Sequence, residues 1–284
     1  MFRQLTIIGV GLIGGSLARA LRQVDACKQI VGYSRDEVHL QKAMELGVID
    51  RYELDIGRAV SGADMVILAV PISVMGGIFR AMLPHLAADA IVSDVGSTKL
   101  AVIEAARAGL GPRCACFVPA HPIAGTEQSG VAASFAGLFE DRRVIVTPLP
   151  ENSIDDIERV RKLWSLCGAE VVDMDAAHHD EVLAATSHLP HLLAYALVDT
   201  LLRLDDSEEI FKYAAGGFRD FSRIASSDPL MWRDICIANR DAILTLLEQF
   251  SLHIDELAQA IRTGDSDSLM TMFTRAKATR DRIK

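Results

Sequence analysis

A glycine-rich segment behind a short apolar run is the feature that most restricts how this chain folds. The run Leu5–Val10 leads into Gly9, Gly11 and Gly14, a G-x-G-x-x-G pattern, and the helical pattern Gly14–Gln23 follows. In such a strand–loop–helix unit the first glycine makes a tight turn, the second lets a phosphate approach the backbone, and the third lets the helix pack on the strand. The helix N-terminus adds free N–H groups. The pattern predicts a dinucleotide-binding Rossmann unit; the alternative is a purely structural glycine turn.

The first 174 residues alternate short β-rich runs with helical patterns, which is typical of a doubly wound parallel sheet. The expected strands are Leu5–Val10, Gln29–Tyr33, Met65–Val70, Ala90–Asp94, Cys116–Pro119 and Val144–Thr147. A further unit, the helix Ile154–Cys167 and the strand Ala169–Asp173, is expected to extend the same sheet.

The alternation of strand-like and helical patterns ends at Asp175, and only helical patterns follow. They cover Ala176–Leu204 with an interruption at Pro190, then Met231–Ile261 and Asp265–Ile283. The fold class that we predict is therefore an α/β Rossmann-type doubly wound domain, residues 1–174, followed by an all-α helical domain, residues 175–284.

Composition narrows the functional classes. The formal net charge of −9 leaves no basic surplus to neutralise phosphates, so a nucleic-acid partner is not expected. The apolar run Leu5–Ala18 after Arg3 imitates a signal peptide, but its glycines make a poor apolar helix. No stretch reaches the ~18 apolar residues of a membrane span. The five cysteines form no disulfide framework, which favours reduced thiols and a cytoplasmic protein.

The end of the second expected strand bears on cofactor choice. NAD enzymes usually place an acidic residue there to accept a hydrogen bond from the ribose 2′-hydroxyl, whereas a 2′-phosphate favours arginine. Here Ser34 and Arg35 follow Tyr33, and Asp36 comes one residue later. We therefore favour NADP and keep NAD open. The expected cofactor-binding residues are Gly9, Gly11, Leu12, Ile13, Gly14, Ser34, Arg35, Val70 and Pro71.

Besides the glycine loop, three clusters of residues, at 93–99, 120–127 and 216–234, are not explained by packing alone. The informative strings of the chain are GVGLIGGS (9–16), DVGSTK (94–99), HPIAGTE (121–127), SHLPH (187–191) and GGFRDFSRIASSDPLMWRDI (216–235). Together they resemble the prephenate/arogenate (cyclohexadienyl) dehydrogenase family of tyrosine biosynthesis, over essentially the whole chain. The resemblance implies oxidative decarboxylation of prephenate or arogenate, with NAD(P)⁺ as hydride acceptor. The products are 4-hydroxyphenylpyruvate or tyrosine.

The resemblance also implies roles for particular residues. His121 is the catalytic group that accepts a hydrogen bond from the ring hydroxyl, and Ser97 holds its imidazole near the nicotinamide. An unperturbed histidine, with a pKa of about 6.5, suits this task. Arg223 takes a substrate carboxylate, since its planar fork matches carboxylate geometry. The other expected substrate-binding residues are His191, His188, Thr126, Trp232 and Asp220.

Several neighbouring residues are open to other interpretations. Asp220 and Glu127 look like ionic partners of arginines at the mouth of the substrate site. Arg219 is a weaker candidate for a carboxylate ligand. His188 and His191, with His178, His179 and Asp180 nearby, would suit a metal ion. A hydride transfer to nicotinamide needs no metal, so we expect none.

Two other classes remain as alternatives. A β-hydroxyacid or imine-type dehydrogenase shares this layout, but the helical half offers no lysine where its base is expected. A catalytically inactive cofactor-sensing protein would have replaced His121 or Arg223, and both are present. Members of the resembled family dimerise through the helical half, and its apolar surplus predicts a homodimer. The choice between prephenate and arogenate, and feedback by tyrosine, stay open.

Overall fold

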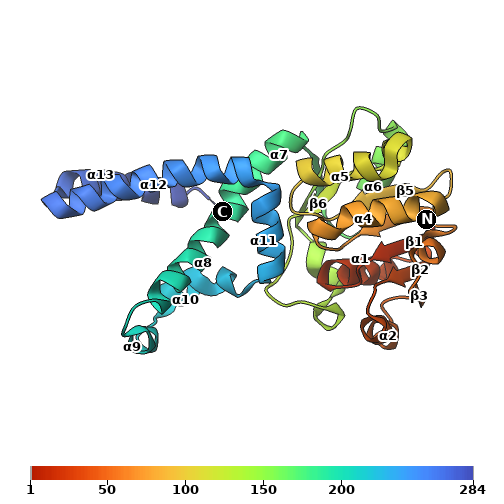
Figure 1. Cartoon of the computed structure of the whole chain (residues 1–284), viewed down its shortest axis with the longest axis horizontal. Coiled ribbons are helices and arrows are strands. Elements are labelled where there is room, and N and C mark those ends of the chain that lie inside the picture. Colours follow the sequence, from red (N-terminus) through yellow and green to blue (C-terminus); the bar gives the residue numbers. More distant parts are fainter. Residues whose placement is uncertain (1, 284) are drawn as a thin grey trace. The chain divides into compact units, whose positions relative to one another are not determined.

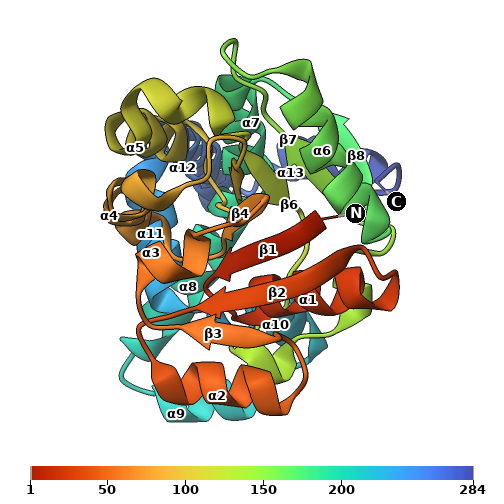
Figure 2. The ribbon, with the colours of Figure 1, turned by 90° about the vertical axis from the view of Figure 1, so that its right-hand side faces the viewer.

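A five-stranded parallel sheet forms the N-terminal part of the chain in the computed structural model, which describes residues 2–283. The strand order is β3-β2-β1-β4-β5, so the chain runs outward from β1 in one direction and then in the other (Figure 2). The strands are β1 (Phe2–Ile8), β2 (Cys27–Tyr33), β3 (Arg51–Glu53), β4 (Met65–Leu68) and β5 (Ile91–Asp94). The predicted doubly wound class is confirmed. Its topological switch point, where ligands of such sheets bind, lies between β1 and β4.

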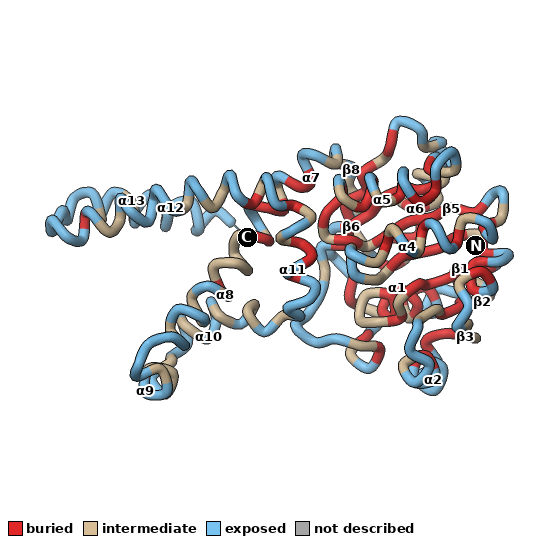
Figure 3. Tube along the Cα trace, in the orientation of Figure 1, coloured by how far each residue is buried: buried red, intermediate tan, exposed pale blue. Residues whose placement is uncertain are grey.

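Both faces of this sheet are covered, which explains why its central strands are continuously apolar. Leu5 and Ile7 of β1 belong to one buried cluster, and Ile8 of the same strand belongs to a second. Figure 3 shows the buried residues concentrated in these strands. The connecting helices are α1 (Leu12–Gln23), α2 (Glu37–Glu45), α3 (Ile56–Val60), α4 (Ile72–Met82) and α5 (Leu100–Leu110). The strand β3 was not predicted, since its three residues are Arg-Tyr-Glu rather than an apolar run.

A second sheet corrects the expected extension of the first. Its strands are β6 (Ala120–Pro122), β7 (Arg143–Val146) and β8 (Glu170–Asp173), with α6 (Ile154–Leu166) before β8. The strand expected at Cys116–Pro119 is wrong: a 3-10 turn runs to Cys116, and only Phe117 bridges to Val92 of β5. The strand β6 instead pairs antiparallel with β7. Pro119 and Pro122 lack N–H donors, so this segment is poorly suited to continue the first sheet.

Helices alone follow β8 in the rest of the described chain, as predicted (Figure 1). The first long pattern is divided into α7 (Ala176–Leu183), a π-helical turn (Ala184–His188) and α8 (Leu189–Leu202). The predicted interruption at Pro190 is therefore confirmed: it is the second residue of α8, and the widened turn precedes it. The next helices are α9 (Ser207–Lys212), α10 (Gly216–Ser222) and α11 (Pro229–Ala238).

The chain divides into two compact units, residues 1–240 and 241–284. The helices α12 (Arg240–Thr263) and α13 (Ser266–Arg280) account for most of the second, so the helix expected at Met231–Ile261 is divided at Asn239. The second unit exposes large apolar side chains, among them Leu252, Ile261 and Phe273. A domain boundary at residue 174 stays a prediction. Within residues 2–283, no helix combines the length and apolarity needed to span a membrane.

Candidate functional site

The glycine loop has the geometry that a pyrophosphate needs. Gly9 has φ +93°, and a Cβ there would lie 2.2 Å from the Ala69 carbonyl oxygen. A Cβ on Gly14 would lie 2.2 Å from the Gly9 carbonyl oxygen, so both positions exclude a side chain. At Gly11, the residue before α1, a Cβ would meet nothing within 4 Å. The backbone there faces open space at a helix N-terminus, so the loop fits a bound phosphate group. Leu12 and Ile13 form the first turn of α1, and Val70 and Pro71 follow β4.

His121 lies in β6 and is only 8% exposed. Its Nδ1 lies 2.9 Å from Nε2 of His179 in α7, and Nδ1 of His179 lies 2.8 Å from Oδ1 of Asp180. Because the Asp180 carboxylate only accepts, Nδ1 of His179 carries a proton and its Nε2 is an acceptor. Nδ1 of His121 therefore donates, and Nε2 of neutral His121 is left as a proton acceptor. Within residues 2–283 no hydrogen bond engages that Nε2.

Burial controls the charge states in this chain of residues. It lowers the pKa of His121 to well below 6.5, and the neighbouring His179, Lys99 and His188 act in the same direction. Burial also lowers the pKa of His179. Asp180 behaves oppositely: burial would raise its pKa, but hydrogen bonds from His179 and from the N–H groups of Lys99 and Leu100 lower it. The arrangement thus keeps a carboxylate beside two neutral imidazoles at neutral pH.

A buried ion pair fixes the loop after β5 to the strand that carries His121. Nζ of Lys99 lies 2.6 Å from Oδ2 of Asp94, and neither side chain is exposed. Nζ also donates to the Ala120 carbonyl at 2.7 Å, while the Ala120 N–H donates to Oδ1 of Asp94 at 3.1 Å. Asp94 further accepts from the Gly96 N–H. These bonds hold the backbone on both sides of Ser97 and next to His121. The expected Ser97–imidazole contact is absent from the hydrogen bonds of residues 2–283, and Ser97 remains a predicted catalytic residue.

The two histidines of the SHLPH string and Trp232 come together. The His191 ring stacks on Trp232 with centroids 3.7 Å apart, and the His188 centroid lies 6.1 Å from that of Trp232. Asn239 donates from Nδ2 to Nδ1 of His188 at 3.1 Å and to the Asp180 carbonyl at 2.7 Å. Nε2 of neutral His188 therefore carries the proton. That Nε2 and Nε1 of Trp232 are buried without a hydrogen-bond partner in the described chain. A hydrogen bond to the Ser97 backbone acts on the pKa of His188, so of these two donors Nε1 of Trp232 is the one that best suits a ligand with acceptor oxygens.

The remaining predicted substrate ligands lie on exposed segments. Arg223 begins the 3-10 turn after α10 and forms an ion pair with Glu127, which was expected to pair with an arginine of this region that the sequence did not identify. Its side chain is 62% exposed, so the guanidinium is accessible. Thr126 is exposed and its hydroxyl accepts from the Gln128 N–H at 3.3 Å. Asp220 is exposed in α10 and forms no ion pair with any residue from 2 to 283. Its role as an ionic partner of an arginine stays a prediction.

The segment after β2 leaves one guanidinium available. Asp36 caps α2, since its Oδ1 accepts from the His39 N–H at 3.2 Å, and its own N–H donates to Oγ of Ser34 at 3.2 Å. Arg35 is exposed and forms no ion pair within residues 2–283. The Asp36 carboxylate is thus directed back to the helix that it caps, while Ser34 and Arg35 lie at the end of β2.

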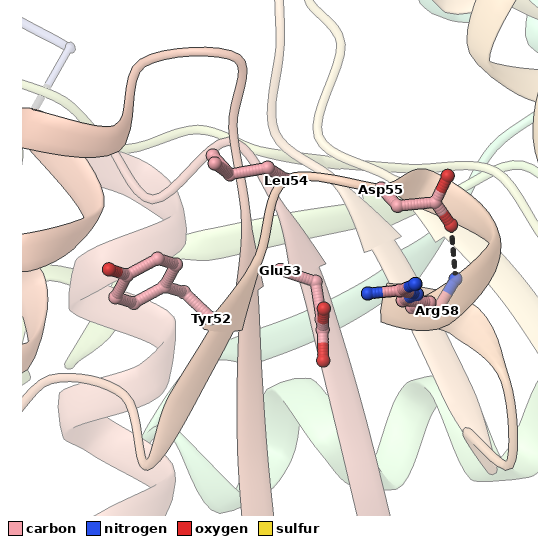
Figure 4. A pocket seen from close by; sticks show the side chains of 5 residues that line it. All are labelled: Tyr52, Glu53, Leu54, Asp55 and Arg58. Atoms are coloured by element: carbon pink, nitrogen blue, oxygen red, sulfur yellow. Dashed lines mark hydrogen bonds between the residues drawn. The ribbon is translucent and has the colours of Figure 1, made fainter.

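A hollow of about 390 Å³ lies beside β3 at the edge of the sheet (Figure 4). Its lining residues are Tyr52, Glu53, Leu54, Asp55 and Arg58. Asp55 caps α3 by accepting from the Arg58 N–H at 2.8 Å. None of the predicted site residues lines this hollow.

Sequence reasoning missed part of the network around His121. Asp94 and Lys99 lie inside the DVGSTK string, and a lysine so close to the end of a buried strand was the available signal. His179 and Asp180 were considered only as metal ligands, whereas they form the hydrogen-bonded chain to His121. Nothing in the sequence singled out Asn239, because its two partners are distant in the chain.

The chain matches two family models that together span most of its length. Residues 17–173 match the nucleotide-binding domain of prephenate dehydrogenase, and residues 175–275 match the prephenate dehydrogenase dimerization domain. Cyclohexadienyl dehydrogenase of Zymomonas mobilis is 38% identical over 100% of this chain and 97% of its own length. Prephenate dehydrogenase of Bacillus subtilis is 36% identical over 98% of this chain and 75% of its own length.

Solved structures agree with these relatives. Prephenate dehydrogenase from A. aeolicus, in complex with hydroxyphenyl propionate and NAD⁺, has a TM-score of 0.93 and 36% identity, covering 100% of this chain and 99% of its own. Synechocystis arogenate dehydrogenase has a TM-score of 0.81 and 27% identity, covering 99% and 100%. The nucleotide-binding half and the helical half thus occur together along one chain. The chain belongs to the prephenate dehydrogenase family of oxidoreductases.

Proposed function

We propose that this protein catalyses the oxidative decarboxylation of prephenate, of arogenate or of both, with His121 as the group that takes the proton from the ring hydroxyl. The observation that carries the proposal is the chain Asp180–His179–His121. It leaves Nε2 of a neutral, largely buried imidazole without a partner in residues 2–283. A group that must accept a proton at neutral pH needs this tautomer and this charge state.

The nicotinamide cofactor, when bound, supplies the hydride acceptor. The glycine loop and the N-terminus of α1 would hold its pyrophosphate, for which Gly9, Gly11 and Gly14 provide the room. The protein's own residues orient the substrate and handle one proton. As the ring aromatises and CO₂ leaves, His121 first accepts the proton of the 4-hydroxyl, and that proton is returned to the same oxygen of the phenol product.

A substrate with two carboxylates needs cationic and N–H partners. Arg223 is accessible and is oriented by Glu127, so it is our choice for a carboxylate ligand. Trp232 supplies a buried N–H donor, His188 lies beside its ring, and His191 stacks on the same tryptophan. Thr126 and Asp220 are proposed to line the exposed side of the substrate site. Ser97, whose loop is held by Asp94 and Lys99, would lie near the nicotinamide.

NADP is the cofactor that we favour over NAD. Ser34 and Arg35 follow β2, and the Asp36 carboxylate is directed to the cap of α2. A free guanidinium at this position suits a 2′-phosphate, and an occupied carboxylate is a weaker acceptor for a 2′-hydroxyl. No metal ion enters the proposal. Feedback inhibition by tyrosine stays a prediction.

A homodimer is the assembly that we propose, with a cytoplasmic location. The family's dimerization domain covers residues 175–275, and apolar side chains of α12 and α13 are exposed in the single chain. Light scattering at micromolar concentration tests this: twice the 30.9 kDa chain mass is expected, and a monomer contradicts it.

The deciding experiment for the activity is an assay of the purified protein with prephenate and with arogenate, each with NAD⁺ and with NADP⁺, followed at 340 nm. Reduction of the cofactor together with release of CO₂ supports the proposal. A protein that binds cofactor but turns over neither substrate contradicts it, and assigns the chain a binding role instead.

A further inference from the structure

His39 connects the first turn of α2 to the glycine loop. Its Nε2 lies 2.8 Å from the carbonyl oxygen of Val10, between Gly9 and Gly11. A carbonyl only accepts, so Nε2 carries the proton and Nδ1 is the remaining ring nitrogen. No hydrogen bond within residues 2–283 engages Nδ1. The half-buried ring is thereby held in one orientation with one nitrogen unused.

The ring lies at the rim where the adenosine ribose of a dinucleotide is bound in a Rossmann domain. The rim is continuous: the Asp36 N–H donates to Oγ of Ser34, the His39 N–H donates to Asp36, and the His39 ring donates to Val10. A ribose hydroxyl beside the end of the second strand and the glycine loop meets this rim. A phosphate on that hydroxyl would place two negative charges there.

We propose that His39 is a third member of the 2′-phosphate site, with Ser34 and Arg35, and that it makes the preference for NADP over NAD increase as the pH falls. The inference rests on the proposed choice of NADP. Nε2 keeps its bond to Val10 in either charge state, so the protonated ring offers Nδ1–H and a positive charge to the phosphate. Histidine is the side chain whose charge changes in the physiological pH range.

The other charged groups near the ring do not replace it in this role. On α2, Lys42 pairs with Glu45 at 3.0 Å, and Glu37 accepts from the Tyr52 hydroxyl at 3.0 Å. On β3, which packs against α2, Arg51 pairs with Glu53 at 2.7 Å. The 3-10 turn Val131–Ala133 and the loop 9–14 carry no titratable side chain. Asp36 and Arg35 remain, and they flank the ring in sequence.

Equilibrium binding tests the proposal without turnover. The probes are 2′,5′-ADP and 5′-AMP, which differ only in the 2′-phosphate, titrated calorimetrically from pH 5.5 to 8.5. The variant is His39→Gln, whose amide can still donate to Val10 but cannot become a cation. A phosphomonoester loses charge below its second pKa of about 6, so wild type and variant are compared at each pH. The exposed His253→Gln serves as the matched control.

We expect His39→Gln to lose affinity for 2′,5′-ADP in a pH-dependent way and to keep its affinity for 5′-AMP. A hydrogen bond to a charged group is worth about 1.5 kcal/mol or more, so the variant should bind 2′,5′-ADP roughly tenfold more weakly near pH 6. The loss should shrink toward pH 8.5, and 5′-AMP binding should be unchanged. Equal affinity of the wild type for both probes overturns the NADP choice and the inference with it. A preference for 2′,5′-ADP with equal pH dependence in wild type and variant overturns only the role of His39.

A second substitution covers the case in which His39→Gln also weakens 5′-AMP, which would indicate a disturbed glycine loop. His39→Arg supplies a permanent cation. It should bind 2′,5′-ADP with a pH dependence that reflects only the ionisation of the phosphate. A His39→Arg protein that binds 5′-AMP normally but shows no preference for 2′,5′-ADP contradicts the proposal.

Discussion

Nε2 of His179 accepts a hydrogen bond from Nδ1 of His121 over 2.9 Å, and this contact decides which nitrogen of His121 is free for the substrate. The proton on Nδ1 of His179 is fixed by Asp180, whose carboxylate is fixed in turn by the N–H groups of Lys99 and Leu100 at 2.7 and 3.0 Å. The start of α5 therefore orients the imidazole of a distant strand. Ring orientation and tautomer come from the same set of bonds.

His121→Asn should reduce kcat by about 10²–10⁴, the usual contribution of a general acid–base group. Substrate affinity should change little, because the carboxylate ligands are other residues. The wild-type kcat/KM should stay level down to pH 6.5 and fall only well below it, since the lowered pKa of His121 keeps the ring neutral until then. Steady-state kinetics over pH 4.5 to 8 measures both effects. The assignment of His121 is contradicted if kcat/KM of the variant still falls at acid pH as in the wild type, or if its kcat is near the wild-type value.

Asp180→Asn should lower kcat while leaving cofactor affinity intact. The amide cannot accept from His179 and from two backbone N–H groups with the strength of a carboxylate. Hydrogen bonds to charged groups are worth about 1.5–3 kcal/mol, so a loss of roughly tenfold to hundredfold is expected. Asp155→Asn, an exposed aspartate in the first turn of α6, is the control. If Asp180→Asn raises KM and leaves kcat unchanged, Asp180 supports the substrate pocket and does not set the tautomer of His121.

Arg223→Ala should raise the KM of the dianionic substrate at least tenfold, because losing the partner of a bound charge costs about 2–5 kcal/mol. Glu127→Gln is the informative companion: it removes the ionic partner and leaves the guanidinium in place. Its KM should change less than that of Arg223→Ala. The KM for the cofactor should be nearly unchanged in both. If Arg223→Ala keeps the wild-type KM, another residue binds the substrate carboxylate, and Arg219 is the next one to test.

The stability of the protein should fall as the pH drops from 6.5 to 4, in part through His188. Burial lowers the pKa of this ring to about 4, so between these values the unfolded chain binds a proton that the folded chain excludes. Its contribution is complete above pH 6.5 and is lost toward pH 4, and it amounts to roughly 3 kcal/mol. Urea unfolding at fixed protein concentration measures it. His188→Gln should show a shallower pH dependence than the wild type; equal slopes contradict the assignment.

The sequence predicted those parts of the fold whose residues interact with near neighbours in the chain. The glycine loop requires glycine at Gly9 and Gly14 for steric reasons that act within one strand–loop–helix unit, so the sequence reveals it. The roles expected of Arg223 and His121 came from resemblance to a family rather than from spacing, and the contact of Arg223 with Glu127 was not specified. The direction of β6 depends on pairing with β7, more than twenty residues away in sequence. A chain such as Asn239–Asp180–His179–His121 joins four positions through tertiary contacts that no periodicity records.

The ratio of kcat/KM for NADP⁺ to that for NAD⁺ tests the segment after β2. If the Arg35 guanidinium meets the 2′-phosphate, a charge-assisted bond of about 1.5–3 kcal/mol predicts a roughly tenfold to hundredfold preference for NADP⁺. Arg35→Ala should remove most of that preference by weakening NADP⁺ alone. The effect should shrink as salt rises, because an exposed contact is screened.

The competing arrangement gives a different pattern in the same measurements. If Asp36 binds the ribose hydroxyls, it does so through Oδ2, since its Oδ1 accepts from the His39 N–H. NAD⁺ should then be preferred by the wild type, and Asp36→Ala should change the ratio more than Arg35→Ala. Asp36→Ala should also destabilise α2, because removal of an N-cap costs about 1 kcal/mol. A lowered melting temperature with an unchanged cofactor ratio in Asp36→Ala identifies Asp36 as a cap only, and leaves the choice of cofactor to Arg35.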